Sequence, residues 1–591
     1  MNIYRKKYYA DTDKNLANKS HKPPGIYTHK FPNNKTHHHD QANKSINTSN
    51  KAGISSPHLF HKVLTKMGYG PTPELIAHIQ TLPGNTEQEK VISYIDEQLN
   101  PESINDNAAQ SLLNNGYQTL NKSRIQLYQQ HYRRPDQAEI PWEFHILPGR
   151  ETFYASFMLA INSKRQLFEI MTDFWHNHFN VYMDGDGISP MFVHYDRDVI
   201  RNDALGNFRQ MLENVTKSSC MLDYLGNAFN HKDAPNENFA RELLELHTIS
   251  AKNYFGHMPA SDVPVDSQGR KIGYVEEDVL EMARALTGWS YSGADWWDYQ
   301  NGNISTGEFL YRQDWHDENS KSIMGNTYHF DPNNQLKDMQ DILDMLAEHP
   351  ATSDFLASKL CKRFISDNPS ESIIASVSET LHQNWQAPNQ IQLGMETLLK
   401  SSEFFNTWGE KIKRPFERAI SAMRQMGITY DFDPTNEYSS WMFWEFSNTG
   451  QNLFYWTSPN GYPDNKAAWL GASSIMSTWR FMQLMGRLRD ANDDTYNDIL
   501  NITLTQFPNA NDRTANNIVN YWFERACGVL PDVQTQDKLA NFMSYTDTSN
   551  PIGTDRNTPI DLNSDIWPSH NQERLFAVVS TIFLTSDFNY R

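Results

Sequence analysis

The chain has few cysteines and no long apolar run. Only three cysteines occur in 591 residues, Cys220, Cys361 and Cys527, and none has a second cysteine at the spacing of a zinc or redox motif. This excludes a thiolate metal site and a dithiol redox centre. No stretch of about 18 consecutive apolar residues is present, so no membrane-spanning helix is expected.

The N-terminal segment lacks the apolar residues that folding or secretion would need. Residues 1–53 are rich in Asn, Lys, His, Pro and Ser and show no periodicity, which predicts a disordered basic tail. No apolar stretch follows the first basic residues, so no secretion signal is visible, and export would need another route or a different start of the chain. The remainder of the chain is strongly acidic, because the total net charge is −19. We therefore expect no binding of nucleic acid by the folded body.

Alternating, strand-like patterns are scarce as well. Apolar residues instead recur at spacings of three and four in segments such as 152–183, 236–249, 276–287, 337–366 and 466–491. The prediction is a mainly α protein, a large multi-helix globular body over residues 54–591 with long irregular loops and few short strands. Residues 289–335 and 428–465 are the long loops, and the second is a candidate sub-boundary.

The segment 167–182, LFEIMTDFWHNHFNVY, carries two histidines. On a regular helix His178 shares the apolar face, and His176 lies about 200° around the axis. A regular helix therefore keeps the two imidazoles apart, whereas an extended chain after Trp175 would bring both to one side. The alternative is a buried, hydrogen-bonded His178 with His176 at the surface.

A second motif helix is predicted over 234–250, APNENFARELLELHTIS. Pro235 and Asn236 are favourable first residues for a helix. His247 lies on the apolar face and Glu242 at its edge. These two side chains either ligate a metal or transfer protons, or they form a buried hydrogen-bonded pair.

The third motif helix, 276–288, presents Glu281 and Arg284 on the side opposite its apolar face. By default they form an exposed ion pair that contributes little stability, unless another layer covers them. His316 and Asp317 follow in the next loop and are candidates for metal binding or proton transfer. A histidine–aspartate pair in a loop is weak support by itself.

Seven strings stand out in order along the chain: MGYGPTP (67–73), FWHNHF (174–179), APNENFARELLELH (234–247), ARALTGW (283–289), HPAT (349–352), KRP (413–415) and SPNGYP (458–463). Together they resemble the bacterial family known as domain of unknown function 1800. The resemblance spans about residues 56–591 and implies no reaction. It implies an exported protein, often encoded beside a second family, domain of unknown function 1501, which is similar to sulfatases. Tyr462 stands where family members often have Trp.

The leading hypothesis is an enzyme whose pocket lies on the three motif helices under the 289–335 loop. His176, His178 and His247 are the candidate ligands of a divalent metal such as zinc, manganese or iron. A metal-free variant would pair Glu242 with a second carboxylate such as Glu281 or Asp317, as in a glycosidase or a lyase. The catalytic candidates are Glu242, Glu281, Arg284, His316 and Asp317.

The substrate that the family's neighbours suggest, by analogy, is an extracellular glycan or related polymer. The rival hypothesis is a non-catalytic assembly or chaperone-like protein that binds another exported protein. Its polar motifs would then be internal hydrogen-bond networks. Convergence of the candidate residues in one solvent-reachable pocket would favour the enzyme.

Overall fold

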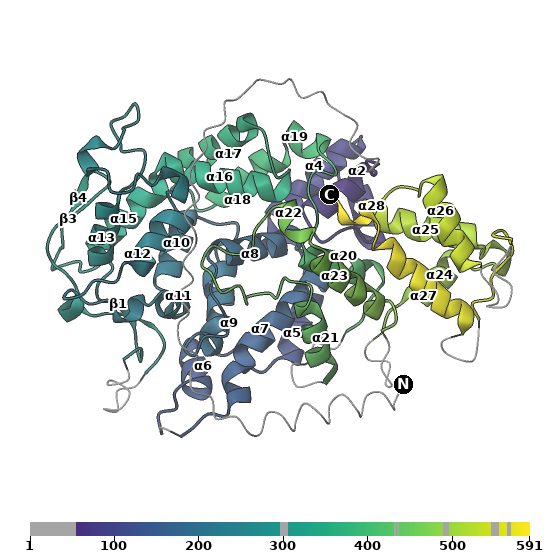
Figure 1. The fold of residues 1–591 in the computed structure, drawn as a ribbon, viewed down its shortest axis with the longest axis horizontal. Coiled ribbons are helices and arrows are strands. Elements are labelled where there is room, and N and C mark those ends of the chain that lie inside the picture. The colour runs from purple at the N-terminus through teal and green to yellow at the C-terminus, as the bar shows by residue number, and fades with distance from the viewer. Residues whose placement is uncertain are drawn as a thin grey trace. The chain divides into compact units, whose positions relative to one another are not determined.

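The computed structural model describes residues 55–136, 138–295, 305–430, 433, 437–488, 496–544, 555–563 and 569–591. The predicted tail, 1–53, lies outside the described residues, as does 296–304 of the first long loop. The described chain is 58% helical, with 26 helices and two small two-stranded sheets. The mainly α prediction is confirmed (Figure 1).

The first seven α-helices of the described chain run up to and include α8, the first motif helix. Several begin at a side chain that accepts a hydrogen bond from the first turn; Thr86 and Glu89 form a reciprocal pair at the start of α4. The helices are α2 (Leu59–Lys66), α3 (Pro73–Thr81), α4 (Glu87–Leu99), α5 (Asn107–Gly116), α6 (Arg124–His131), α7 (Trp142–Asn162) and α8 (Gln166–His178).

The middle of the chain contains two π-helices, η3 and η5, which are rare and are often found at functional sites. The segment 337–366, which carries one helical pattern, is two helices because Pro350 starts a new helix capped by His349. The elements are α9 (Phe192–His194), η3 (Tyr195–Arg201), α10 (Phe208–Thr216), α11 (Ser219–Tyr224), α12 (Glu237–Glu242), η5 (Leu243–His247), α13 (Glu276–Ala285), α15 (Lys337–Glu348), α16 (Pro350–Phe364), α17 (Glu371–Gln383), α18 (Gln390–Leu399) and α19 (Ser402–Asn406).

The last third of the chain packs helices of the C-terminal end against α20 and α23. Gly528 follows α25 in the left-handed conformation that commonly ends a helix. The helices are α20 (Pro415–Gln425), α21 (Glu437–Ser447), α22 (Lys466–Trp469), α23 (Ala472–Met485), α24 (Ile499–Gln506), α25 (Ala515–Cys527), α26 (Val533–Met543), α27 (His570–Ile582) and α28 (Ser586–Asn589).

Two antiparallel strand pairs lie in the loop after α13. Strand β1 (Trp289–Tyr291) pairs with β2 (Phe309–Tyr311), with Trp289 opposite Tyr311. Strand β3 (Lys321–Ile323) pairs with β4 (Asn326–Tyr328) through a two-residue turn at Met324 and Gly325. Both turn residues have positive φ, 50° and 82°, as this tight hairpin requires.

A hydrophobic core runs through the described chain from Phe60 to Phe588. Its largest buried side chains include Trp175, Trp289 and Trp522. Trp175 also donates a hydrogen bond to the carbonyl oxygen of Ala204 at 2.9 Å, which ties α8 to the turn before α10. Among the described residues no helix combines the length and apolar character needed to cross a membrane.

Candidate functional site

Helix α8 buries both of its histidines. The helix is regular to His178, so the imidazoles leave it in different directions: Nε2 of His176 is 2.8 Å from Oδ1 of Asp196, and Nε2 of His178 is 3.1 Å from the carbonyl oxygen of His247. The alternative that placed His176 at the surface is wrong, because only 7% of this residue is exposed. The π-helix η3, which carries Asp196, packs on that side of α8.

His176 belongs to a buried ion network. Asp196 also accepts a hydrogen bond from Arg201 at 2.9 Å, and Arg201 contacts both carboxylate oxygens of Glu169 at 3.0 and 2.9 Å. Burial opposes ionisation of Asp196, but Arg201 and His176 outweigh it, and the pKa of this carboxyl lies below its ordinary value. The network joins α8 to η3, which is a structural role.

A second cluster forms around Lys359 of α16. The Nζ of Lys359 is 2.7 Å from Nδ1 of His178. Since Nε2 of His178 faces a carbonyl oxygen, that nitrogen carries the proton, and Nδ1 accepts a hydrogen bond from the lysine. Within the described ranges no carboxylate lies within 4 Å of this ammonium group. We call Lys359, His178 and His247 the Lys359 cluster.

The Lys359 cluster disfavours positive charge. Burial lowers the pKa of Lys359 from 10.5 to about 8, although the carboxylate of Asp464 opposes the shift. Burial, followed by the charge of Lys359, lowers the pKa of His178 well below its usual range. The imidazole is therefore neutral, and the lysine titrates close to physiological pH.

His247 has no hydrogen-bond partner for either ring nitrogen among the residues described, and both nitrogens are buried. Burial and Lys359 lower its pKa to about 3. Its ring packs 5.0 Å from that of Phe179 and 6.2 Å from that of His178. Each buried, unpartnered polar group destabilises the fold by about 1–3 kcal/mol, so its retention calls for an explanation such as reaction or binding.

Glu242 is the last residue of α12 and is half-buried. The π-helical turn that follows places His247 five residues later, close to the same side of the helix. Burial, then the neighbouring Glu245, raises the pKa of Glu242 to about 7. The charge of Glu242 adds to the burial that raises the pKa of Tyr224 to about 12.

His316 belongs to a third, fully buried group. Its Nδ1 donates to the carbonyl oxygen of Thr287 at 2.7 Å, and its Nε2 lies 3.0 Å from Asp338 and 3.1 Å from Lys321. Lys321 and Asp338 form an ion pair at 2.6 Å with both side chains fully buried. This group fastens the loop after β2 to α15 and is closed to solvent.

Glu281, Arg284 and Asp317 form the tie between the same loop and α13. Arg284 donates to Asp317 at 2.8 Å and to Glu281 at 2.6 Å, while Glu281 accepts from the backbone N–H of Ser322 at 2.9 Å. Burial opposes ionisation of Asp317, but Arg284 and Asn319 lower its pKa to about 2. The loop covers Glu281 and Arg284, and Arg284 occupies the carboxylates of both Glu281 and Asp317.

A segment that the sequence does not single out as a roof, residues 452–465, lies over the C-terminal end of α8. Asn180 donates to the carbonyl oxygens of Trp456 and Ser458 at 2.9 and 2.8 Å, and Asn177 exchanges two hydrogen bonds with the backbone of Tyr462. The expected roof, 289–335, instead contacts α11, α13 and α15 in its described part. The string SPNGYP therefore meets FWHNHF in space.

Gly461 allows this close approach. Its φ is +68°, and a Cβ at this position would lie 2.1 Å from the carbonyl oxygen of Asn177. Only glycine fits both the left-handed backbone and the contact. Tyr224 holds the same segment from the other side by donating to the carbonyl oxygen of Thr457 at 3.0 Å.

An ion network that includes Asp464 lies next to the Lys359 cluster. Asp464, at the end of the 452–465 segment, pairs with Lys411 at 2.9 Å, and Lys411 pairs with Asp367 at 3.1 Å. Arg414, from the string KRP, forms an ion pair with Asp173 of α8. Four of the family-like strings therefore converge around one end of α8: FWHNHF, APNENFARELLELH, KRP and SPNGYP.

The donor atoms of the predicted metal ligands do not converge in the described structure. His176 pairs with Asp196, whereas Nδ1 of His178 faces an ammonium group, which would repel a cation. In the described part of the chain, no group of three or more His, Cys, Asp or Glu side chains is placed to hold a metal ion. The residues present do not fit a metal centre in this arrangement.

Sequence reasoning missed Lys359, Asp464 and Asn180. A lone lysine on a helix is normally solvated, and no spacing marks Lys359 as different from its exposed neighbour Lys362. A signal was available for the other two, because they lie beside the strings FWHNHF and SPNGYP. Polar residues within several matching strings are better candidates than polar residues between them.

The fold and this convergence define a large helical protein whose family-like strings meet around the C-terminal end of α8. The chain belongs to the family described as "Protein of unknown function (DUF1800)", which it matches over residues 62–590. No curated protein and no solved structure matches the chain.

Proposed function

We propose that this protein is an enzyme that transfers protons at the Lys359 cluster, with Glu242 as the second group, on an extracellular glycan. The observation that carries the proposal is a partly buried lysine 2.7 Å from a neutral imidazole. No carboxylate in the described structure neutralises this lysine at short range. If the charge of Lys359 had no chemical role, an apolar residue at position 359 would make the folded protein more stable.

The pKa values suit acid–base chemistry near neutral pH. Glu242, with a pKa of about 7, is a carboxylate above that pH and accepts a proton. Lys359, with a pKa of about 8, is an ammonium group below that pH and donates a proton directly from its Nζ. The two ionisations predict that the reaction rate depends on pH in a bell-shaped curve, which rises near pH 7 and falls near pH 8.

Aromatic side chains support a glycan as the substrate class. Trp456 is partly exposed in the 452–465 segment, and its ring lies 4.7 Å from that of Tyr462. Phe355 lies beside both His178 and Lys359, 5.9 and 5.3 Å away. Aromatic faces of this kind pack against the apolar faces of sugar rings.

The rival function is an assembly protein that binds another exported protein. The observation that favours it is that His176, His316, Glu281, Arg284 and Asp317 all hold elements of the fold together. The same finding removes Glu281 and Asp317 as the second carboxylate of a metal-free pair, since Arg284 holds both. The enzyme proposal therefore depends on Glu242 and the Lys359 cluster.

The test is a screen of polysaccharides with the full chain, measuring new reducing ends and the ultraviolet absorption of unsaturated products. Lys359→Met should lower the rate by about 100-fold or more, the contribution of a general acid or base. Lys362→Met, an exposed lysine on the same helix, is the matched control and should leave the rate unchanged. No turnover on any polymer, or equal rates for wild type and Lys359→Met, would favour the assembly protein.

A further inference from the structure

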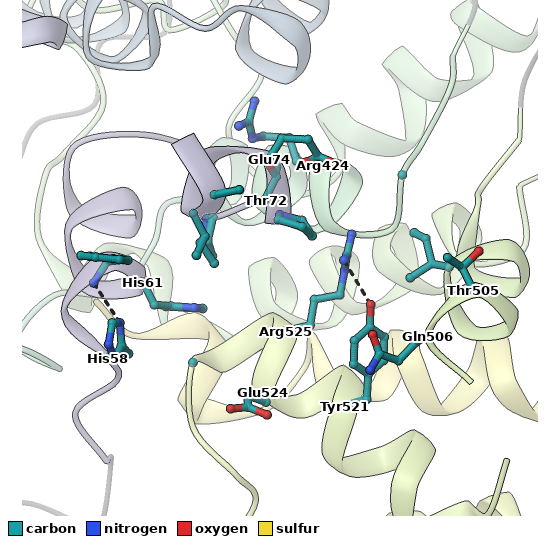
Figure 2. Close-up of a pocket in the computed structure, with 18 of the residues that line it drawn as sticks. His58, His61, Thr72, Glu74, Arg424, Thr505, Gln506, Tyr521, Glu524 and Arg525 are labelled. Atoms are coloured by element: carbon teal, nitrogen blue, oxygen red, sulfur yellow. Dashed lines mark hydrogen bonds between the residues drawn. The ribbon is translucent and has the colours of Figure 1, made fainter. Parts of the chain in front are cut away.

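A large cavity lies apart from the Lys359 cluster, between α2 and α3 near the start of the described chain and α24 and α25 near its end. Its volume is about 970 Å³, within the range of small-molecule sites. Figure 2 shows its polar lining. Neither Glu242 nor a residue of the Lys359 cluster lines it, so the cavity is independent of the proposed function.

The string MGYGPTP builds one wall. Gly70 has a φ of +92°, and a Cβ there would lie 2.5 Å from Oγ of Ser421, so glycine lets the chain pack directly on α20. Thr72 then caps α3, accepting from the backbone N–H of Leu75 at 3.3 Å, and Pro73 begins that helix. The turn thus presents Pro71, Thr72 and Pro73 to the cavity.

Arg525 is the central cation of the opposite wall. Its Nε donates to the carbonyl oxygen of Gln425 at 3.0 Å, its Nη1 to the hydroxyl of Tyr521 at 3.3 Å, and the guanidinium lies 5.5 Å from the ring of Trp522. No carboxylate in the described structure pairs with it within 4 Å, and Nη2 has no partner there. In Figure 2 Arg525 and Glu524 leave α25 in different directions.

The other charged residues of the cavity limit which anions could bind to Arg525. Arg424 also lines the cavity, but its Nη1 donates to the carbonyl oxygens of Ala160 and Ile161 on the far side. The carboxylates of Glu74, Asp498 and Glu524 line the cavity as well. These acids would repel a polyanion, whereas a single negative charge on Arg525 is compatible with them.

We infer that this cavity binds a small amphipathic carboxylate. The carboxylate accepts hydrogen bonds from Nη2 of Arg525 and from the hydroxyl of Tyr521, because hydrogen bonds from a charged guanidinium to a carboxylate are stronger than neutral ones. The apolar part of the ligand packs against Phe60, Ile76 and Ile502. Arg525 is held in place by its backbone and ring contacts, so little side-chain entropy is lost on binding.

The test is isothermal titration calorimetry of the full chain with 4-phenylbutyrate, its neutral amide and inorganic phosphate. The acid should bind at least about 10-fold more tightly than the amide, the loss expected for one charge-assisted contact. Arg525→Gln should weaken the acid by a similar factor. Ala77→Phe, which narrows the cavity without changing its charge, should abolish binding, and Arg165→Gln, outside the cavity, should have no effect.

Equal affinity for the acid and the amide, or unchanged binding in Arg525→Gln, would overturn the inference. Phosphate binding as tight as that of the acid would also overturn it, because the site would then be a simple anion site. The melting temperature of each variant checks folding. If Arg525→Gln does not fold, Ala77→Phe and the acid–amide comparison still decide the outcome.

Discussion

Replacing Lys359 by Met should stabilise the protein at neutral pH while removing activity. Folding lowers the pKa of Lys359 from 10.5 to about 8, so the ammonium form is less favourable in the folded protein than in the unfolded chain. That difference corresponds to about 3 kcal/mol at 1.36 kcal/mol per tenfold change. Partial exposure of the Lys359 side chain reduces this free-energy penalty. The Met variant also loses the hydrogen bond to His178, which is worth about 1–2 kcal/mol.

We therefore expect Lys359→Met to raise the free energy of unfolding by about 1 kcal/mol at pH 7. The gain depends on pH in a defined direction. Below pH 8 the wild-type lysine is charged in both states and carries the full penalty. Between pH 8 and 10.5 the folded state has lost its proton while the unfolded chain keeps it, so wild-type stability rises with pH. The advantage of the variant should disappear over this interval.

The assay is thermal unfolding of wild type, Lys359→Met and the control Lys362→Met at pH 7, 8, 9 and 10. For a chain of this size, 1 kcal/mol corresponds to a shift on the order of 1 °C. A variant that is several degrees less stable, by the same margin at every pH, would refute the reasoning. Lys359 would then be a structural anchor and not a strained functional group.

Three further predictions follow from contacts elsewhere. Gly461→Ala should remove most activity because its Cβ would collide with the carbonyl oxygen of Asn177; unchanged turnover would show that the 452–465 segment has no part in the reaction. Lys321→Met leaves the buried Asp338 carboxylate beside His316 and should lower the free energy of unfolding by about 3 kcal/mol, with faster hydrogen exchange over 312–328 as the measurement. Glu242→Gln should eliminate the rate limb near pH 7, and a limb that persists would exclude Glu242 as its origin.

The helices could be predicted because their apolar residues repeat locally. The face of α8 follows directly from a period of 3.6 residues, which is why His178 is correctly expected in the core. The same period does not predict which polar face of a helix is covered by another segment in the folded protein. His176 is on a face that η3 covers, and Arg284 on one that the loop after β2 covers.

Residues of the candidate site were harder to predict because their partners are remote. Lys359 lies 181 positions from His178 along the chain, and nothing local to α16 marks it. His316 illustrates the opposite error, since a histidine–aspartate pair in a loop suggests chemistry. The structure shows His316 sealed against Lys321 and Asp338 with no exposed side-chain surface.

Periodicity, charge and the ordered strings of the sequence determined the helical class, the acidic body and the family of this protein, because each is a property of local composition or of residue order. Only the tertiary structure decided which polar side chains lose water and which charges face each other. Burial and pairing act through space between segments that are distant in sequence. Those two effects turn Lys359 from an ordinary surface residue into the centre of the candidate site.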